Sequence, residues 1–331
     1  MRYCPLLFLS WFFLVNGSAQ SSPLLLQNPE YSGLMNPANT LNLANTFLEL
    51  RAGLGYRQVE GNWLPQEKRT ENRFGFVESW LDNNNVGQSG LTVGGYFFEE
   101  RSQALSLDAV YLNGKLQLFL NRQPGREIFI AVGFNIGAVQ HRIRYDAWSD
   151  SSAIALLNPD FYKLLPDWST GIYLSFPAGF GKIWIEYAIP PTFRFGKVYG
   201  NKGYRDFISV GLTKQLRGKG AFDIYTKLAT FNNKFNFLDG YLNGNLSDHI
   251  AGLSFAPYSI PIYGGVSFNT RQEKIYFDIG TSIIVKTEGW GILYKRSGLS
   301  LKYTFESKGK GFQAHSLGVV FFQNKAYRPL D

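Results

Sequence analysis

The residues best suited to chemistry are three histidines, and their spacing gives none of them a partner. His141, His249 and His315 lie far apart, and none sits in a spaced cluster with acids or cysteine that would bind a metal. Successive side chains of a strand point to opposite faces, so the neighbours His315 and Ser316 cannot form a direct catalytic pair, and Asp248 next to His249 fails likewise. The sequence therefore predicts no catalytic, cofactor-binding or metal-binding residues, and we expect a non-enzymatic protein.

Isolated charges form the second group of chemically capable residues. They alternate with apolar residues and comprise Glu49, Arg51, Arg57, Asp108, Asp223, Lys227, Asp278, Lys302 and Glu306. A ring of one sign would indicate an ion-selective pore, whereas mixed signs pair across strands and fill a narrow barrel. We therefore predict that these residues, with Glu49, Arg51, Asp108 and Asp278 as the leading candidates, are lumen charges in structural ion pairs.

The elements that carry these charges show a two-residue hydrophobic period. Segment 48–57 places Leu, Ala and Tyr on one face and Glu, Arg and Gly on the other, and segments 105–111, 273–284 and 299–306 repeat this division. This period is typical of strands with one apolar and one polar face. After residue 19 no segment approaches the roughly eighteen continuous apolar residues of a membrane helix. We therefore expect an all-β protein.

Fifteen segments carry a strand pattern, and bacterial outer-membrane barrels have an even number of strands, so we predict about fourteen antiparallel strands. The candidates are 46–57, 71–80, 90–99, 103–121, 126–142, 168–177, 180–189, 205–215, 221–231, 234–243, 249–256, 260–270, 273–284, 291–306 and 311–323. Turn-forming Gly, Asn, Asp and Lys residues connect them, as in 217–220 and 308–311.

A soluble sandwich would also alternate, so the polar face decides between the two architectures. The outward face of a sandwich should be rich in Lys, Glu, Thr and Ser. Segment 130–137 instead sets Ala, Gly and Asn against Ile, Val and Phe, which favours a crowded lumen with lipid outside. Aromatic residues near strand ends, such as 96–98 and 321–322, fit interfacial girdles, although aromatic residues of an ordinary core remain an alternative. We predict a transmembrane outer-membrane β-barrel.

The termini divide the chain further. Residues 1–19 combine a basic start, an apolar stretch and small residues, as in a signal peptide, so we expect export to the outer membrane. This peptide would take the single cysteine, Cys4, with it. We assign 20–45 to an irregular N-terminal segment, 46–323 to the barrel and 324–331 to a C-terminal tail. The N-terminal segment can lie in the periplasm or enter the barrel, and the sequence does not decide between them.

One internal segment and the charge balance bear on partners. Residues 143–167 lack alternation, with a short helix expected near 152–157, and this longest loop is either a partner contact or a passive surface loop. The formal net charge is +8, but no run of five basic residues occurs. We therefore exclude nucleic acid as a partner and expect a basic surface or lumen near anionic lipid headgroups.

Three short motifs resemble one family of outer-membrane proteins. They are Asn36-Pro37-Ala38 in the N-terminal segment, Tyr56-Arg57-Gln58 in the first strand, and 166–172, a loop entering a Gly-Ile strand. In these motifs and in the order of its hairpins the chain resembles the PorP/SprF family of the type IX secretion system of Bacteroidota. The family's Trp after the second motif is Val59 here, and the C-terminus extends beyond the expected final aromatic residue.

The resemblance implies a non-enzymatic barrel without cofactors. Its partners would be outer-membrane lipid and either periplasmic components of type IX protein secretion or a secreted surface adhesin, with a role in gliding motility in species that glide. Asn-Pro-Ala also occurs in barrels that resemble fatty-acid transporters. The alternative is therefore an outer-membrane transport channel for hydrophobic or small anionic solutes.

Overall fold

The structure of the chain is a computed structural model. It describes residues 32–39, 46–61, 70–81, 90–101, 105–121, 128–143, 163–179, 181–191, 204–216, 220–231, 246–257, 262–269, 274–288, 293–308 and 312–327. Among these residues, no helix has the length and apolar character needed to cross a membrane.

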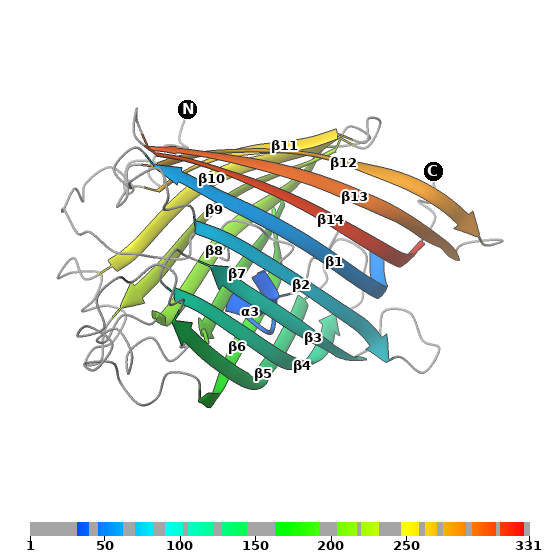
Figure 1. The fold of residues 1–331 in the computed structure, drawn as a ribbon. Helices are drawn as coiled ribbons and strands as arrows, with labels where there is room; N and C mark the ends of the chain where they lie inside the picture. Colours follow the sequence, from blue (N-terminus) through cyan, green and yellow to red (C-terminus); the bar gives the residue numbers. More distant parts are fainter. Residues whose placement is uncertain are drawn as a thin grey trace, which may run out of the picture.

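Fourteen antiparallel strands form a closed barrel, which confirms the predicted fold class and strand number (Figure 1). The strands are β1 Thr46–Gly61, β2 Thr70–Leu81, β3 Gly90–Arg101, β4 Leu105–Asn121, β5 Ile128–Ile143, β6 Leu164–Ala178, β7 Gly181–Ile189, β8 Tyr204–Leu216, β9 Gly220–Phe231, β10 Leu246–Pro257, β11 Ile262–Asn269, β12 Lys274–Glu288, β13 Leu293–Lys308 and β14 Phe312–Tyr327. Each strand pairs with its sequence neighbours, and β1 pairs with β14 to close the ring. The closure leaves no sheet edge exposed to lipid.

Apolar side chains cover most of the outside of the barrel, and on β12 the polar side chains point inward. On β12, Ile275, Phe277 and Ile279 are exposed on the outer face, whereas Lys274 and Tyr276 are buried inside. The same division holds along β13, as the two-residue period predicts. An apolar outer surface this extensive requires lipid around it. The protein is therefore a transmembrane barrel of the outer membrane.

The ends of the barrel differ in the lengths of their connections. The longest connections, 144–163, 190–203 and 232–245, join strands at one end, while the short connections 179–180 and 217–219 join strands at the other. Outer-membrane barrels have short periplasmic turns and longer extracellular loops. The strand ends that the long connections join are therefore extracellular, and the start of β1 and the end of β14 are periplasmic.

Several strands extend beyond their predicted limits, as β1 does to Gly61 and β12 to Glu288, and two of these extensions alter other predictions. Strand β6 begins at Leu164, so the loop expected over 143–167 is shorter at both ends. Pro166 obscures the period there, yet Leu164 and Trp168 continue the outer face. Strand β14 runs past 323 to Tyr327, and its polar last residues pair with the start of β1 beyond the apolar band.

Several sequence predictions concern residues outside the described ranges. They are the signal peptide 1–19, the helix near 152–157, the tail beyond Tyr327 and the extra strand at 234–243.

Candidate functional site

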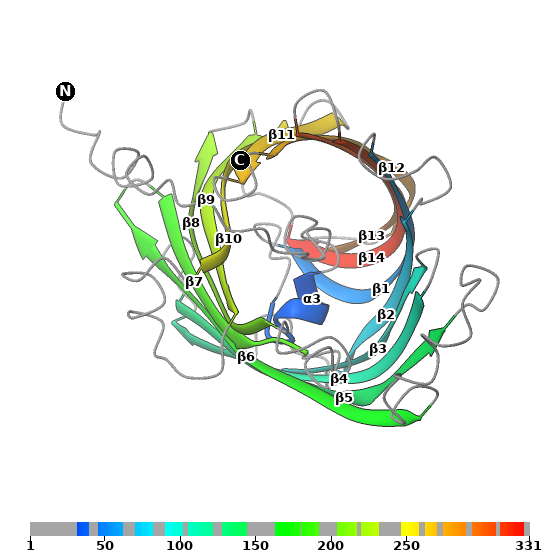
Figure 2. The same ribbon diagram turned by 60° about the vertical axis from the view of Figure 1, so that its left-hand side comes forward.

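The candidate site is a short segment of the chain held inside the barrel. Helix α3, Ser32–Met35, lies within the ring of strands (Figure 2). A tight turn follows: the Asn39 amide donates to the Asn36 carbonyl at 2.9 Å, and the Ala38 amide donates to Asn36 Oδ1 at 3.0 Å. Asn and Pro at the first two positions suit this turn. We call residues 32–39 the plug.

Two glycines, which have no side chains, form the barrel wall where the turn of the plug contacts it. Gly133 on β5 and Gly171 on β6 are directly paired neighbours that face the lumen. A Cβ on Gly133 would overlap the Pro37 carbonyl, and a Cβ on Gly171 would overlap Asn36 Oδ1. Only glycine allows the backbone of the plug to approach this closely. The paired glycines are therefore a fitted seat for the Asn-Pro-Ala turn.

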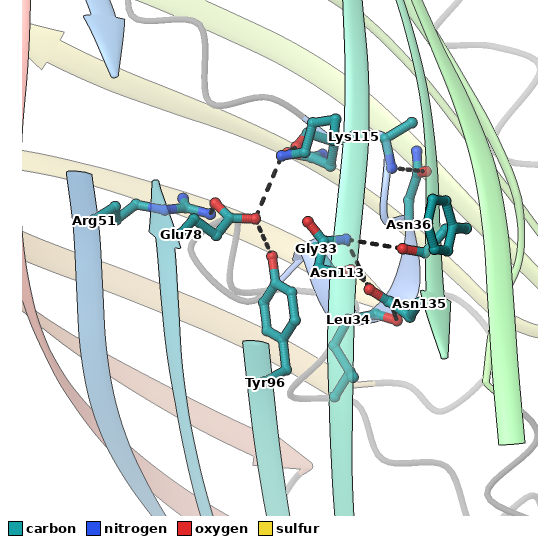
Figure 3. Close-up of polar contacts among 12 residues, drawn as sticks. Gly33, Leu34, Asn36, Arg51, Glu78, Tyr96, Asn113, Lys115 and Asn135 are labelled. Atoms are coloured by element: carbon teal, nitrogen blue, oxygen red, sulfur yellow. Dashed lines mark hydrogen bonds and ion pairs between the residues drawn. The ribbon is translucent and has the colours of Figure 1, made fainter. Parts of the chain in front are cut away.

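Amide side chains of the wall bind the helical part of the plug. Asn135 Nδ2 lies 3.2 Å from the Gly33 carbonyl and 2.8 Å from Ser169 Oγ. Asn113 Nδ2 in turn donates to Asn135 Oδ1 at 2.7 Å (Figure 3). Both asparagines are buried. These bonds satisfy the carbonyls at the end of the helix, which buried backbone requires.

A buried charge network binds the other end of the plug (Figure 3). Glu78 forms an ion pair with Arg51 at 2.5 Å and with Lys115 at 3.4 Å, and the Tyr96 hydroxyl donates to the same carboxylate. Lys115 Nζ also donates to the Asn39 carbonyl at 2.6 Å. The Lys115 ammonium thus contacts Glu78 of the wall and Asn39 of the plug, so the network links the plug to the wall.

A second carboxylate, Glu186 on β7, binds the turn directly. It accepts hydrogen bonds from Asn39 Nδ2 at 2.6 Å and from Asn36 Nδ2 at 3.5 Å. Hydrogen bonds to a charged group in a buried site are stronger than neutral ones. The plug is therefore fixed from β4, β5 and β7, and from β6 by the Ile172 carbonyl, which accepts from Asn36 Nδ2 at 3.5 Å.

A separate set of ion pairs lies on the wall formed by β1, β12 and β13. Glu306 binds Arg57 at 2.5 Å and Lys274 at 2.8 Å, and Asp278 lies 3.6 Å from Lys302 Nζ. Each carboxylate meets at least one cation across neighbouring strands. Within the described part of the chain none of these ion pairs involves the plug, so they stabilise the wall itself.

Apolar side chains line much of the lumen on the extracellular side of the plug. This lumen apolar cluster contains Leu34, Met35, Phe74, Phe76, Tyr96, Phe98, Leu107, Ala109, Tyr111, Val139, Ala188, Phe207 and Val320, with Tyr225 packed against it. Phe98, Leu107 and Phe207 stand near the extracellular ends of their strands. Tyr96 and Phe98 were expected in an outer girdle, but they point inward and only Phe97 faces lipid.

The predicted lumen charges have different outcomes. Arg51 and Asp278 lie in the lumen in ion pairs, as expected. Asp108 was predicted wrongly: it lies on the outer face with Val110 and binds Arg142 at 3.3 Å. The apolar residues 107, 109 and 111 were expected to face lipid, but they belong to the lumen apolar cluster. Asp108, which alternates with them, therefore faces outward. Glu49 is in β1, but its side chain lies outside the described part of the chain.

The three motif segments occupy different places. Asn36, Pro37 and Ala38 form the turn of the plug and are buried. Arg57 is in the lumen, whereas Tyr56 and Gln58 are on the outer face of β1. The motifs do not meet in one site, and only the first belongs to the plug.

Sequence analysis missed Glu78, Lys115 and Glu186, the residues that hold the plug. Glu78 follows Phe74 and Phe76 on the same face of β2, so hydropathy gives no sign that this face is interior. Isolated charges within apolar strands were the available signal. Among the described residues, no group of three His, Cys, Asp or Glu residues could hold a metal ion.

Comparison with known proteins gives no family or curated match, but it does give solved barrels. No family model matches, and no curated protein matches. A Pseudomonas aeruginosa FadL homologue has a TM-score of 0.49 at 9% identity, over 88% of this chain and 92% of that chain. The P. putida toluene transporter TodX has 0.49 at 8%, over 90% and 94%. The Acinetobacter baumannii outer membrane protein Omp33 has 0.42 at 9%, over 83% and 98%. The function proposed below therefore rests on the residues of this chain.

Proposed function

We propose that the protein is an outer-membrane channel for small apolar solutes, with the plug as its gate. The observation that supports this proposal is the lumen apolar cluster next to the plug. A water-filled channel has a polar interior. Here aromatic and aliphatic side chains face inward, and Leu34 and Met35 of the plug pack against them. A solute that moved past a displaced plug would contact these apolar side chains.

The attachment of the plug suits a gate. It is bound by hydrogen bonds and one bridging ammonium rather than by a covalent link, and each described bond to the wall can be exchanged for water when the plug moves. Lumen ion pairs such as Arg51 with Glu78 and Arg57 with Glu306 hold the barrel wall without needing the plug. Movement of residues 32–39 would therefore open the lumen while the barrel stays intact.

Uptake by cells with an intact outer membrane tests the proposal. The probe is the apolar dye N-phenyl-1-naphthylamine, and a sugar of similar size is the polar control. We expect the wild-type protein to accelerate dye entry over an empty vector without accelerating sugar entry. Phe98→Ser with Phe207→Ser should remove this acceleration, whereas Phe97→Ser on the outer face should not. Equal dye entry with and without the protein would contradict the proposal.

A second candidate function is a role in type IX secretion or in surface-adhesin attachment. The partners would then be periplasmic proteins of the secretion system or the adhesin. The resemblance of the Asn36-Pro37-Ala38 and Tyr56-Arg57-Gln58 motifs supports it. Affinity purification from detergent-solubilised outer membrane separates the two candidates. Recovery of secretion-system proteins or of an adhesin favours the secretion role, and recovery of the barrel alone with dye uptake favours the channel.

A further inference from the structure

A band of charged side chains interrupts the apolar outer face at the extracellular ends of β2 to β5. It consists of Glu71, Arg73, Glu99, Arg101, Asp108 and Arg142, which we call the rim belt. The residues next to it toward the middle of the barrel, Val77, Phe97 and Val110, are exposed and apolar. The belt therefore begins where the apolar band ends, at the level of the outer-leaflet headgroups.

The strand register arranges the belt in two rows. Glu71 pairs with Arg101 on β3, Arg101 with Ser106 on β4, and Ser106 with Arg142 on β5. In the second row, Arg73 pairs with Glu99, which pairs in turn with Asp108. Neighbouring strands lie about 4.8 Å apart, so Arg101 and Arg142, two strands apart, stand roughly 10 Å apart. The arginines can thus contact two groups of one large headgroup.

The arginines stand further out of the belt than the acids. The side chains of Arg73, Arg101 and Arg142 are 47%, 44% and 54% exposed, whereas those of Glu99 and Asp108 are 17% and 34% exposed. The outermost groups of the belt are therefore guanidinium groups, although its formal charges are balanced.

Among the described residues, the acids hold the guanidinium groups in place through only some of their N–H donors. Arg101 Nε donates to Glu99 Oε1 at 2.5 Å, and Arg142 lies 3.3 Å from Asp108 Oδ2 and 2.7 Å from Gln140 Oε1. A guanidinium has five N–H donors and binds phosphate in a bidentate manner. The side chains of Arg101 and Arg142 are 44% and 54% exposed, so a ligand outside the barrel can reach them.

From this placement we propose that the rim belt binds the phosphate groups of the phosphorylated glycolipid in the outer leaflet. The lipid's acyl chains would lie on the apolar band beneath the belt, where Phe97 and Val110 are exposed. The phosphates would bind the three guanidinium groups. This lipid would thus be fixed on one side of the barrel, over β2 to β5, rather than distributed around it.

Native mass spectrometry of the full-length protein with purified bisphosphorylated lipid A tests the proposal. The variant Arg73→Gln/Arg101→Gln/Arg142→Gln should bind lipid A about tenfold more weakly, and Arg142→Gln alone should show a smaller loss. The matched control is Lys214→Gln, an exposed cation near the periplasmic end of β8. This control should bind as the wild type does.

Three outcomes would overturn the proposal. They are equal binding by the triple variant and the wild type, an equal loss in Lys214→Gln, and displacement of lipid A by an equal concentration of phosphatidylglycerol. The last outcome would show attraction to any anionic lipid rather than recognition of a bisphosphorylated headgroup.

Discussion

At the scale of single residues, the distinctive feature is a carboxylate buried between two cations. Glu78 has no exposed surface, and its partners Arg51 and Lys115 are nearly as buried. A buried ion pair adds little stability compared with apolar packing, but removal of one partner leaves a buried charge without compensation. The main effect of removing Glu78 would therefore be to leave the buried cations Arg51 and Lys115 without their counter-charge.

The first prediction concerns this carboxylate. Glu78→Gln should lower the free energy of unfolding by about 3 kcal/mol, because Arg51 and Lys115 lose their shared counter-charge. Denaturant unfolding of the barrel in detergent micelles measures the change. The matched control is Glu99→Gln in the rim belt, where the pairs are partly exposed, and its cost should stay below about 1 kcal/mol. Equal costs for the two variants would refute the assigned role of Glu78.

Residue-level reasoning from sequence succeeded where the two faces of a strand differ clearly. In β13, Leu299 and Leu301 face lipid while Lys302 and Glu306 face the lumen, as the period predicts. In β4 it failed at Asp108, because the lumen is itself apolar near the extracellular end and hydropathy no longer distinguishes inside from outside.

At the scale of elements, the plug and the paired glycines of β5 and β6 form one fitted unit. The prediction for this unit concerns Gly133→Val, whose side chain would occupy the place of the Pro37 carbonyl and displace the plug. A cysteine reporter at Ala38 measures this displacement. In an Ala38→Cys background a water-soluble maleimide should react slowly, because position 38 is fully buried, and it should react much faster once Gly133→Val is added.

Gly95→Ala is the matched control for Gly133→Val, because it adds a side chain to the outer face of β3, away from the plug. Its labelling rate should equal that of the reporter alone. If Gly133→Val also left the rate unchanged, the paired glycines would not be the seat of the plug.

A further prediction at this scale concerns the seam that closes the barrel. Residues Asn324, Lys325 and Ala326 of β14 pair with the first residues of β1. Truncation after Gln323 should shorten this seam and lower the temperature at which the folded form disappears on semi-native gels. Removal of residues 328–331 alone should have little effect. Identical melting of the two truncations would show that the last part of β14 is dispensable.

The position of the plug illustrates what sequence could not predict about the elements. The turn signal at 36–38 is local, but Asn135 and Glu186 are 102 and 150 residues away from the plug residues that they bind. Nothing in the alternating pattern shows which strands will face that turn. The sequence therefore did not decide whether segment 20–45 lies in the periplasm or in the barrel. The structure places residues 32–39 inside the barrel.

At the scale of the whole molecule, outer-membrane placement follows from closure of the ring and from the apolar exterior. The fourteen strands were within reach of sequence reasoning, because period and turn signals are local and repeat along the chain. The arrangement of the lumen could not be predicted in this way. Its ion pairs among β1, β12 and β13 and its apolar cluster, drawn mainly from β2, β3 and β4, depend on pairing around the full ring.

The central claim is that residues 32–39 close the lumen, and ion conductance across a planar lipid bilayer tests it most directly. The wild-type protein should give little conductance, because the plug is bound to the wall. A variant that lacks residues 32–39, folded to the same heat-resistant form, should give stable stepwise conductance. Equal conductance of the two proteins, whether both closed or both open, would contradict the claim.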